Sequence, residues 1–102
     1  MKYKTEIALA YFKECGLPRP EVEYRFHSAR KWRFDFCWPK HLLALEVQGG
    51  LFVRGRHNQG AAMLKEHEKL NAAAILGYRI MYTTPRGLCT KDFVTQLKEA
   101  MK

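Results

Sequence analysis

The chain has 102 residues, of which 47% are hydrophobic and 13% aromatic, as expected of a single small domain with one compact core, spanning residues 1–102. It carries 18 Lys and Arg against 10 Asp and Glu, and this formal net charge of +8 favours a polyanionic partner. No apolar run is long enough to cross a membrane, no signal-peptide pattern is present, and three widely spaced cysteines lack zinc-site spacing. We therefore expect a cytoplasmic protein with no membrane partner and no structural zinc.

The N-terminal part predicts one helix followed by one strand. The helix is expected over residues 3–14, with Gly16 as its stop signal. The stripe that would face the core consists of Ile7, Ala10, Tyr11 and Glu14. After a stiff connector with two prolines, residues 21–27 alternate apolar and polar side chains, which is typical of a strand.

The central stretch, residues 31–50, reads KWRFDFCWPKHLLALEVQGG and predicts a β-hairpin. Two runs with period two, residues 32–38 and 42–48, flank a short loop. Pairing Trp38 with Leu43 sets Phe36 against Leu45, and it sets Phe34 against Val47 on one wholly apolar face. The aromatic side chains of residues 32–38 are expected to pack in the core under a helix; a platform for stacking nucleobases is the alternative.

The same register places Asp35 opposite Glu46 on the other face. Directly opposed like charges destabilise a sheet, so a cation between them would explain the arrangement. A hard divalent ion such as Mg²⁺ suits a site with one or two carboxylates. Alternatively, both residues are solvated on an open face and Arg33 neutralises them.

The remaining chain predicts a helix, a strand and a second helix. Residues 51–59 form a loop, and residues 60–76 form a long helix that Gly77 caps. Its inward stripe is expected to be Met63, His67, Leu70 and Ala74. Residues 78–83 read as a strand, parallel to the third through a right-handed crossover. After a turn at residues 85–87, Thr90 caps a last helix whose apolar stripe is Phe93, Val94, Leu97 and Met101. The element order is thus α-β-β-β-α-β-α, an α/β fold with a mixed four-stranded sheet flanked by helices.

This order, together with several short motifs, resembles the PD-(D/E)XK nuclease superfamily and its restriction-endonuclease-like core. The closer likeness is to small phage and prophage endonucleases similar to the very-short-patch-repair and VRR-Nuc groups. The motifs that carry it are EYRFH (23–27), KWRFDF (31–36), LEVQGG (45–50), GRH (55–57) and EKLNAAAILGYRI (68–80). The likeness covers roughly residues 16–84.

The resemblance implies a metal-dependent DNA endonuclease, used in phage DNA processing, repair or recombination, in which Asp35, Glu46 and the backbone carbonyl of Val47 bind Mg²⁺ or Mn²⁺. Glu6 matches the place where many members contribute another acidic ligand, although by itself it reads as a surface glutamate. A metal held by two carboxylates can activate a water and stabilise developing negative charge, which phosphodiester hydrolysis requires.

The third motif position departs from the superfamily, because Gln48 stands where a lysine is usual. Glutamine can orient a water by hydrogen bonding but is neither a base nor a cation. Lys69 on the long helix can compensate, as relocated lysines do in this superfamily, or it is an ordinary exposed helix lysine. His57 can act as a proton shuttle or phosphate ligand, or it is a loop histidine without a role.

Two basic clusters bracket the acidic pair and predict contacts with DNA phosphates. The residues expected to make these contacts are Arg30, Lys31, Arg33, Arg54, Arg56 and His57. One active site in a small domain suggests a homodimer that addresses two strands. Two alternatives stay open: a catalytically weak or inactive DNA-binding module with the same fold, and a nuclease selective for junctions or flaps.

Overall fold

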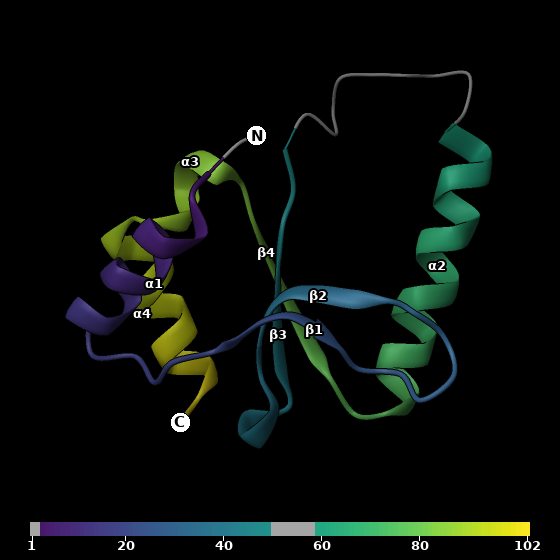
Figure 1. The fold of residues 1–102 in the computed structure, drawn as a ribbon, viewed down its shortest axis with the longest axis horizontal. Coiled ribbons are helices and arrows are strands. Elements are labelled where there is room, and N and C mark those ends of the chain that lie inside the picture. The colour runs from purple at the N-terminus through teal and green to yellow at the C-terminus, as the bar shows by residue number, and fades with distance from the viewer. Residues whose placement is uncertain (1–2, 50–58) are drawn as a thin grey trace.

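The computed structural model describes residues 3–49 and 59–102, which form an α/β domain built on one four-stranded sheet (Figure 1). The strands are β1 (Glu21–Arg25), β2 (Arg33–Trp38), β3 (Leu43–Val47) and β4 (Arg79–Thr83). The helices are α1 (Thr5–Glu14), α2 (Gln59–Ile75), α3 (Pro85–Leu88) and α4 (Lys91–Ala100), with a 3₁₀ turn, η1 (Pro39–His41), between β2 and β3. In this part of the chain, no helix is long and apolar enough to span a bilayer.

The sheet has the order β1-β2-β3-β4 and mixes both pairing modes. β1, β2 and β3 are antiparallel neighbours, whereas β4 joins β3 in parallel after the chain has passed through α2. The predicted hairpin register is confirmed for the pairs Phe36–Leu45, Cys37–Ala44 and Trp38–Leu43. Its loop closes through η1 and through Leu42, which adopts a left-handed conformation at φ 49°.

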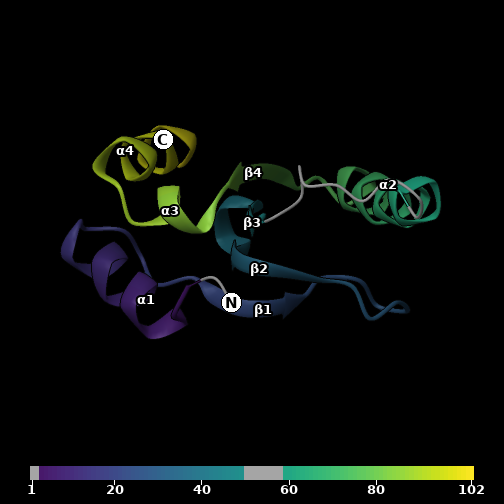
Figure 2. The ribbon, with the colours of Figure 1, turned by 90° about the horizontal axis from the view of Figure 1, so that it is seen from above.

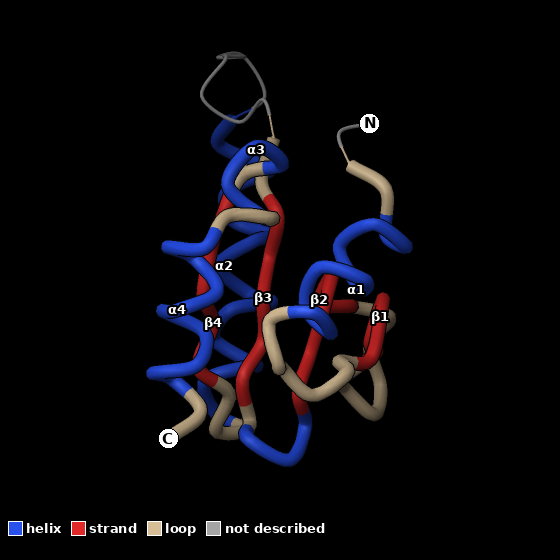
Figure 3. The backbone as a smooth tube through the Cα atoms, turned by 90° about the vertical axis from the view of Figure 1, so that its left-hand side faces the viewer, coloured by secondary structure: helices blue, strands red, loops and turns tan. Residues whose placement is uncertain are grey.

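Helices cover both faces of the sheet. Figure 2 shows α1 and α4 on one side of the strands and α2 on the other, and Figure 3 shows α2 behind the strands when α4 is in front. The larger core lies under α1, α3 and α4 and includes Phe12, Phe36, Trp38, Leu43 and Leu45. The smaller core lies under α2 and comprises Phe26, Phe34, Cys37, Ala44 and Ala73. Leu43 and Leu45 face one core while Ala44 faces the other, as period two requires.

The C-terminal helix follows its predicted pattern. Phe93, Val94 and Leu97 are buried, and the Thr90 hydroxyl accepts a hydrogen bond from the Phe93 N–H at 3.3 Å. The predicted turn at residues 85–87 is instead the one-turn helix α3, whose N-cap is Thr84.

Two predicted helix stripes are wrong. In α1 the buried residues are Ala8 and Phe12, while Ile7 is 61% exposed. The rotation of α1 follows Phe12, whose ring packs against Phe36 and Trp38 at centroid distances of 5.6 and 5.9 Å, because aromatic side chains bury the most area.

In α2 the expected stripe faces outward: Met63 is 51% exposed, and His67 and Ala74 are exposed as well. The inward side of α2 instead carries Lys69 and the fully buried Ala73.

The predicted wholly apolar face of the hairpin is also wrong, because it changes sides at Asp35. Phe36 packs in the core under α1, whereas Phe34 packs in the core under α2, stacked on Phe26 at 4.1 Å. The change coincides with Glu23 on β1, which has a left-handed φ of 52° and interrupts the β1–β2 pairing beside Asp35. The acidic residue therefore lies where the twisted hairpin passes from one layer to the other.

Candidate functional site

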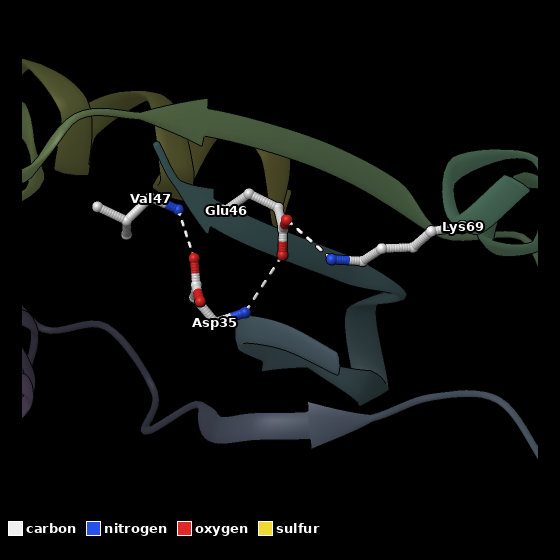
Figure 4. A network of polar contacts seen from close by, with 4 residues as sticks. All are labelled: Asp35, Glu46, Val47 and Lys69. Carbon is white, nitrogen blue, oxygen red and sulfur yellow. Dashed lines mark hydrogen bonds and ion pairs between the residues drawn. The ribbon is translucent and has the colours of Figure 1, made fainter. Parts of the chain in front are cut away.

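Asp35 on β2 and Glu46 on β3 come together where the β2–β3 ladder ends. The last described backbone pair is Phe36–Leu45, and beyond it the carboxylates replace carbonyl oxygens as acceptors. The Val47 N–H donates to Asp35 Oδ2 at 2.7 Å, and the Asp35 N–H donates to Glu46 Oε2 at 3.3 Å (Figure 4). The backbone of β3 thus holds the Asp35 carboxylate, and the backbone of β2 holds the Glu46 carboxylate. Both acids are therefore fixed by strands of the sheet.

Lys69 reaches this pair from α2. Its Nζ donates to Glu46 Oε1 at 2.9 Å, and the two side chains are only 13% and 11% exposed. Figure 4 shows the Lys69 side chain extending from the helix toward the carboxylate. The contact depends on the small core under α2, because Ala73, one turn after Lys69, packs there with Phe34. Lys69 therefore lies in contact with the acidic pair and is not an exposed helix lysine.

Burial governs the protonation of Glu46. Desolvation raises the pKa of this carboxyl above its ordinary value, and the nearby charge of Asp35 raises it further. The hydrogen bond and charge of Lys69 and the Asp35 N–H lower the pKa of Glu46, but do not cancel the effect of burial. A cation beside Glu46 thus stabilises a charge that the site otherwise disfavours.

The donor set fits a hard divalent cation that keeps several waters. Within residues 3–49 and 59–102, no three His, Cys, Asp or Glu side chains form a metal-binding group, so the protein offers two carboxylates. In a strand, the N–H and the C=O of one residue point to the same neighbouring strand. The Val47 N–H points to Asp35, so the Val47 carbonyl points to the same side and adds a third oxygen. Mg²⁺ is commonly held by one or two carboxylates with water completing its shell, so the residues fit this ion.

The other predicted site residues are placed unevenly around the pair. Gln48 is partly buried next to the site, and its N–H donates to the Thr83 carbonyl at 2.8 Å, so alternation puts its side chain on the face of Glu46. Glu6 is not brought to the site: it is exposed and lines a cavity of about 550 Å³ with Leu9, Ala10, Lys13, Leu17 and Arg19.

The basic residues of the hairpin are exposed, and two of them are engaged in ion pairs. Arg33 contacts Glu23 at 3.4 Å, whereas Lys69 contacts Glu46, so the cation beside the acidic pair is Lys69 and not Arg33, which the alternative interpretation had placed there. Arg30 contacts Glu68 on α2 at 3.5 Å and lies 4.1 Å over the ring of Trp32. Lys31 is exposed in the same turn. Arg54, Arg56 and His57 lie outside the described residues.

Sequence reasoning missed two residues of this site, Tyr82 and Glu66. Tyr82 pairs with Glu46 in the parallel β3–β4 register. Burial is the largest cause that raises the pKa of the Tyr82 phenol, and the charges of Glu46 and Glu66 raise it further. Glu66 precedes Lys69 by three residues and is partly buried on α2. The predicted crossover could have suggested Tyr82, because it places β4 beside β3.

Comparison of the chain with protein-family models, with curated proteins and with solved structures found no match in any of the three.

Proposed function

We propose that the chain is a divalent-metal-dependent endonuclease of the PD-(D/E)XK type that hydrolyses phosphodiester bonds in DNA. The single observation that carries the proposal is the 2.9 Å contact of Lys69 with Glu46. It brings a cation from α2 to two acids on β2 and β3, and it supplies the positive charge that Gln48 cannot. The excess of basic residues supports a polyanionic substrate.

Each residue has a defined task in this proposal. Asp35, Glu46 and the Val47 carbonyl hold the ion, which supplies an activated water and neutralises developing charge when bound. The Lys69 ammonium has three N–H donors, so those not used by Glu46 can hold a water or a phosphate oxygen. The Gln48 amide orients the attacking water.

The first test combines metal-dependent stability with cleavage. Mg²⁺ or Mn²⁺ should raise the melting temperature of the wild type, because a ligand that binds only the folded state stabilises it. The increase should disappear as the pH falls through the raised pKa of Glu46, since a metal ligand must be deprotonated. Supercoiled plasmid, single strands, flaps and four-way junctions should be assayed with each ion and with chelator.

The variant Asp35→Asn serves as the matched loss-of-function protein. Its carboxamide oxygen can still accept from the Val47 N–H, so the hairpin should persist while cleavage and metal stabilisation are lost. A wild type that shows neither DNA cleavage nor a rise in melting temperature with Mg²⁺ or Mn²⁺ would contradict the endonuclease proposal.

The second candidate is a non-catalytic DNA-binding module with the same fold. The observation that favours it is that both acids already have protein donors, Lys69 for Glu46 and the Val47 N–H for Asp35. In that case DNA binding should survive in chelator and Asp35→Asn should bind DNA at least as tightly as the wild type, with no cleavage by either protein.

A further inference from the structure

Tyr82 occupies a special position beside the acidic pair. It lies on β4 directly opposite Glu46 in the parallel register, so the two side chains share one face of the sheet. Glu46 is only 8% exposed, whereas Tyr82 is 45% exposed, which makes the tyrosine an accessible neighbour of a buried acid.

Among the described residues, no protein group forms a hydrogen bond with the hydroxyl of Tyr82, which leaves this hydroxyl available to a ligand there. Burial and the charges of Glu46 and Glu66 raise its pKa, so the phenol is protonated at neutral pH and remains a donor.

The charges around Tyr82 explain why a neutral donor is useful here. Asp35, Glu46 and Glu66 contribute three carboxylates, and Lys69 contributes one ammonium. An anionic phosphodiester is therefore repelled by the bare site, and it needs donors that do not compete with a cation for the carboxylates. A phenol meets this requirement, because it donates a hydrogen bond and carries no charge that would repel a metal ion.

We propose that Tyr82 is a substrate-binding residue whose hydroxyl donates a hydrogen bond to a non-bridging oxygen of the phosphodiester held over Asp35 and Glu46. The inference rests on the proposed nuclease function and adds to it a donor from β4, on the opposite side of Glu46 from Asp35.

The test uses Tyr82→Phe, which removes only the hydroxyl, and Tyr11→Phe as the matched control. Tyr11 lies on α1 and packs against the core on the other face of the sheet. Loss of a hydrogen bond to a charged group should lower kcat/KM for DNA about 10- to 100-fold in Tyr82→Phe. The melting temperature, and its increase with Mg²⁺, should equal those of the wild type, and Tyr11→Phe should cleave normally.

A sulfur substitution in the substrate separates a direct contact from a structural role. In a DNA with phosphorothioate linkages of one diastereomer, the sulfur is a weaker acceptor, so the wild type should be slowed. In Tyr82→Phe the same substitution should cost less, because the contact is already gone. An undiminished kcat/KM in Tyr82→Phe, or an equal sulfur penalty in both proteins, overturns this inference while wild-type cleavage still supports the nuclease. A wild type that cleaves no substrate overturns both.

Discussion

Among single residues, Glu46 has the most demanding environment. It is buried beside another acid, and the Lys69 ammonium is in contact with it. Removing one member of a buried ion pair strands the other charge, whereas replacing both is far less costly. We therefore expect the effects of replacing Lys69 and Glu46 on the free energy of unfolding to be strongly coupled.

Glu46→Gln should lower the free energy of unfolding by up to about 3 kcal/mol without metal, because the buried Lys69 ammonium loses its anion. Lys69→Met should cost less, since Glu46, whose pKa is raised, can take up a proton. The double variant should be more stable than the sum of the single effects predicts, by about 1 kcal/mol or more. Urea denaturation of all four proteins measures this coupling.

Glu68→Gln is the control for these variants, because Glu68 neighbours Lys69 on α2 but forms an exposed ion pair with Arg30. Such pairs contribute little to stability, so this variant should unfold like the wild type. Equal effects of Glu46→Gln and Glu68→Gln on the free energy of unfolding would show that the buried pair contributes no more to stability than the exposed pair.

Among the elements, α2 decides whether the site exists. Its inward face is small and polar, with Ala73 fully buried and Lys69 nearly so, while Leu64 and Ile75 are 65% and 84% exposed. A helix that buries so little apolar area is held weakly, because burial of apolar surface is the main stabilising term. The position of Lys69 thus depends on a few contacts near the C-terminal end of α2.

Ala73→Leu should displace α2, because the added side chain has no space beside Phe34 and Ala44. Overpacking of this kind typically costs about 1–3 kcal/mol. Activity should fall further than stability alone explains, since Lys69 is moved away from Glu46. Ala74→Leu places the same side chain on the exposed side of α2 and should leave both properties unchanged. Thermal denaturation and DNA cleavage of the two variants, compared side by side, measure the effect.

If Ala73→Leu and Ala74→Leu behave alike, the core under α2 does not position Lys69.

Hydrogen exchange tests independently whether α2 is held weakly. The amides of α2 should exchange faster than those of α4, whose Phe93, Val94 and Leu97 are buried.

For the whole molecule, the proposed function predicts that the net charge of +8 governs the encounter with DNA. Each phosphate that a Lys or Arg neutralises releases counterions, so DNA affinity should fall steeply as salt rises. Replacing Arg54 and Arg56 by Ala should weaken binding across all sequences. It should also flatten the slope of log K against log salt by about 2, if each residue contacts one phosphate. Fluorescence anisotropy at several salt concentrations, without divalent ions, gives the slope.

Lys91→Ala with Lys98→Ala is the matched control, because it removes the same charge from α4, which lies on the side of the sheet opposite α2. It should lower affinity slightly and leave the slope nearly unchanged. Equal flattening by both double variants would mean that net charge alone, rather than a defined surface, directs binding.

Local patterns in the sequence determined much of the architecture. Period two predicted the strands, and the pairing of Trp38 with Leu43 followed because a slip by one residue would move charges onto the apolar face. Thr90 was recognisable as a cap because its hydroxyl bonds locally to the Phe93 N–H. The meeting of Asp35 with Glu46 was predictable for the same reason, since it depends on a hairpin with a short loop.

Only the tertiary structure decided which faces the helices bury and which distant groups join the acids. Ile7 and Met63 lie on apolar stripes, yet both are exposed, because the packing of Phe12 on one face and of Ala73 on the other sets the rotation of each helix. Phe34 and Phe36 pack in different cores where Glu23 on the neighbouring strand β1 has a left-handed φ, which periodicity does not encode. Lys69 and Tyr82 reach Glu46 only through the crossover from β3 to β4, a long-range arrangement that depends on the packing of the whole domain rather than on neighbouring residues.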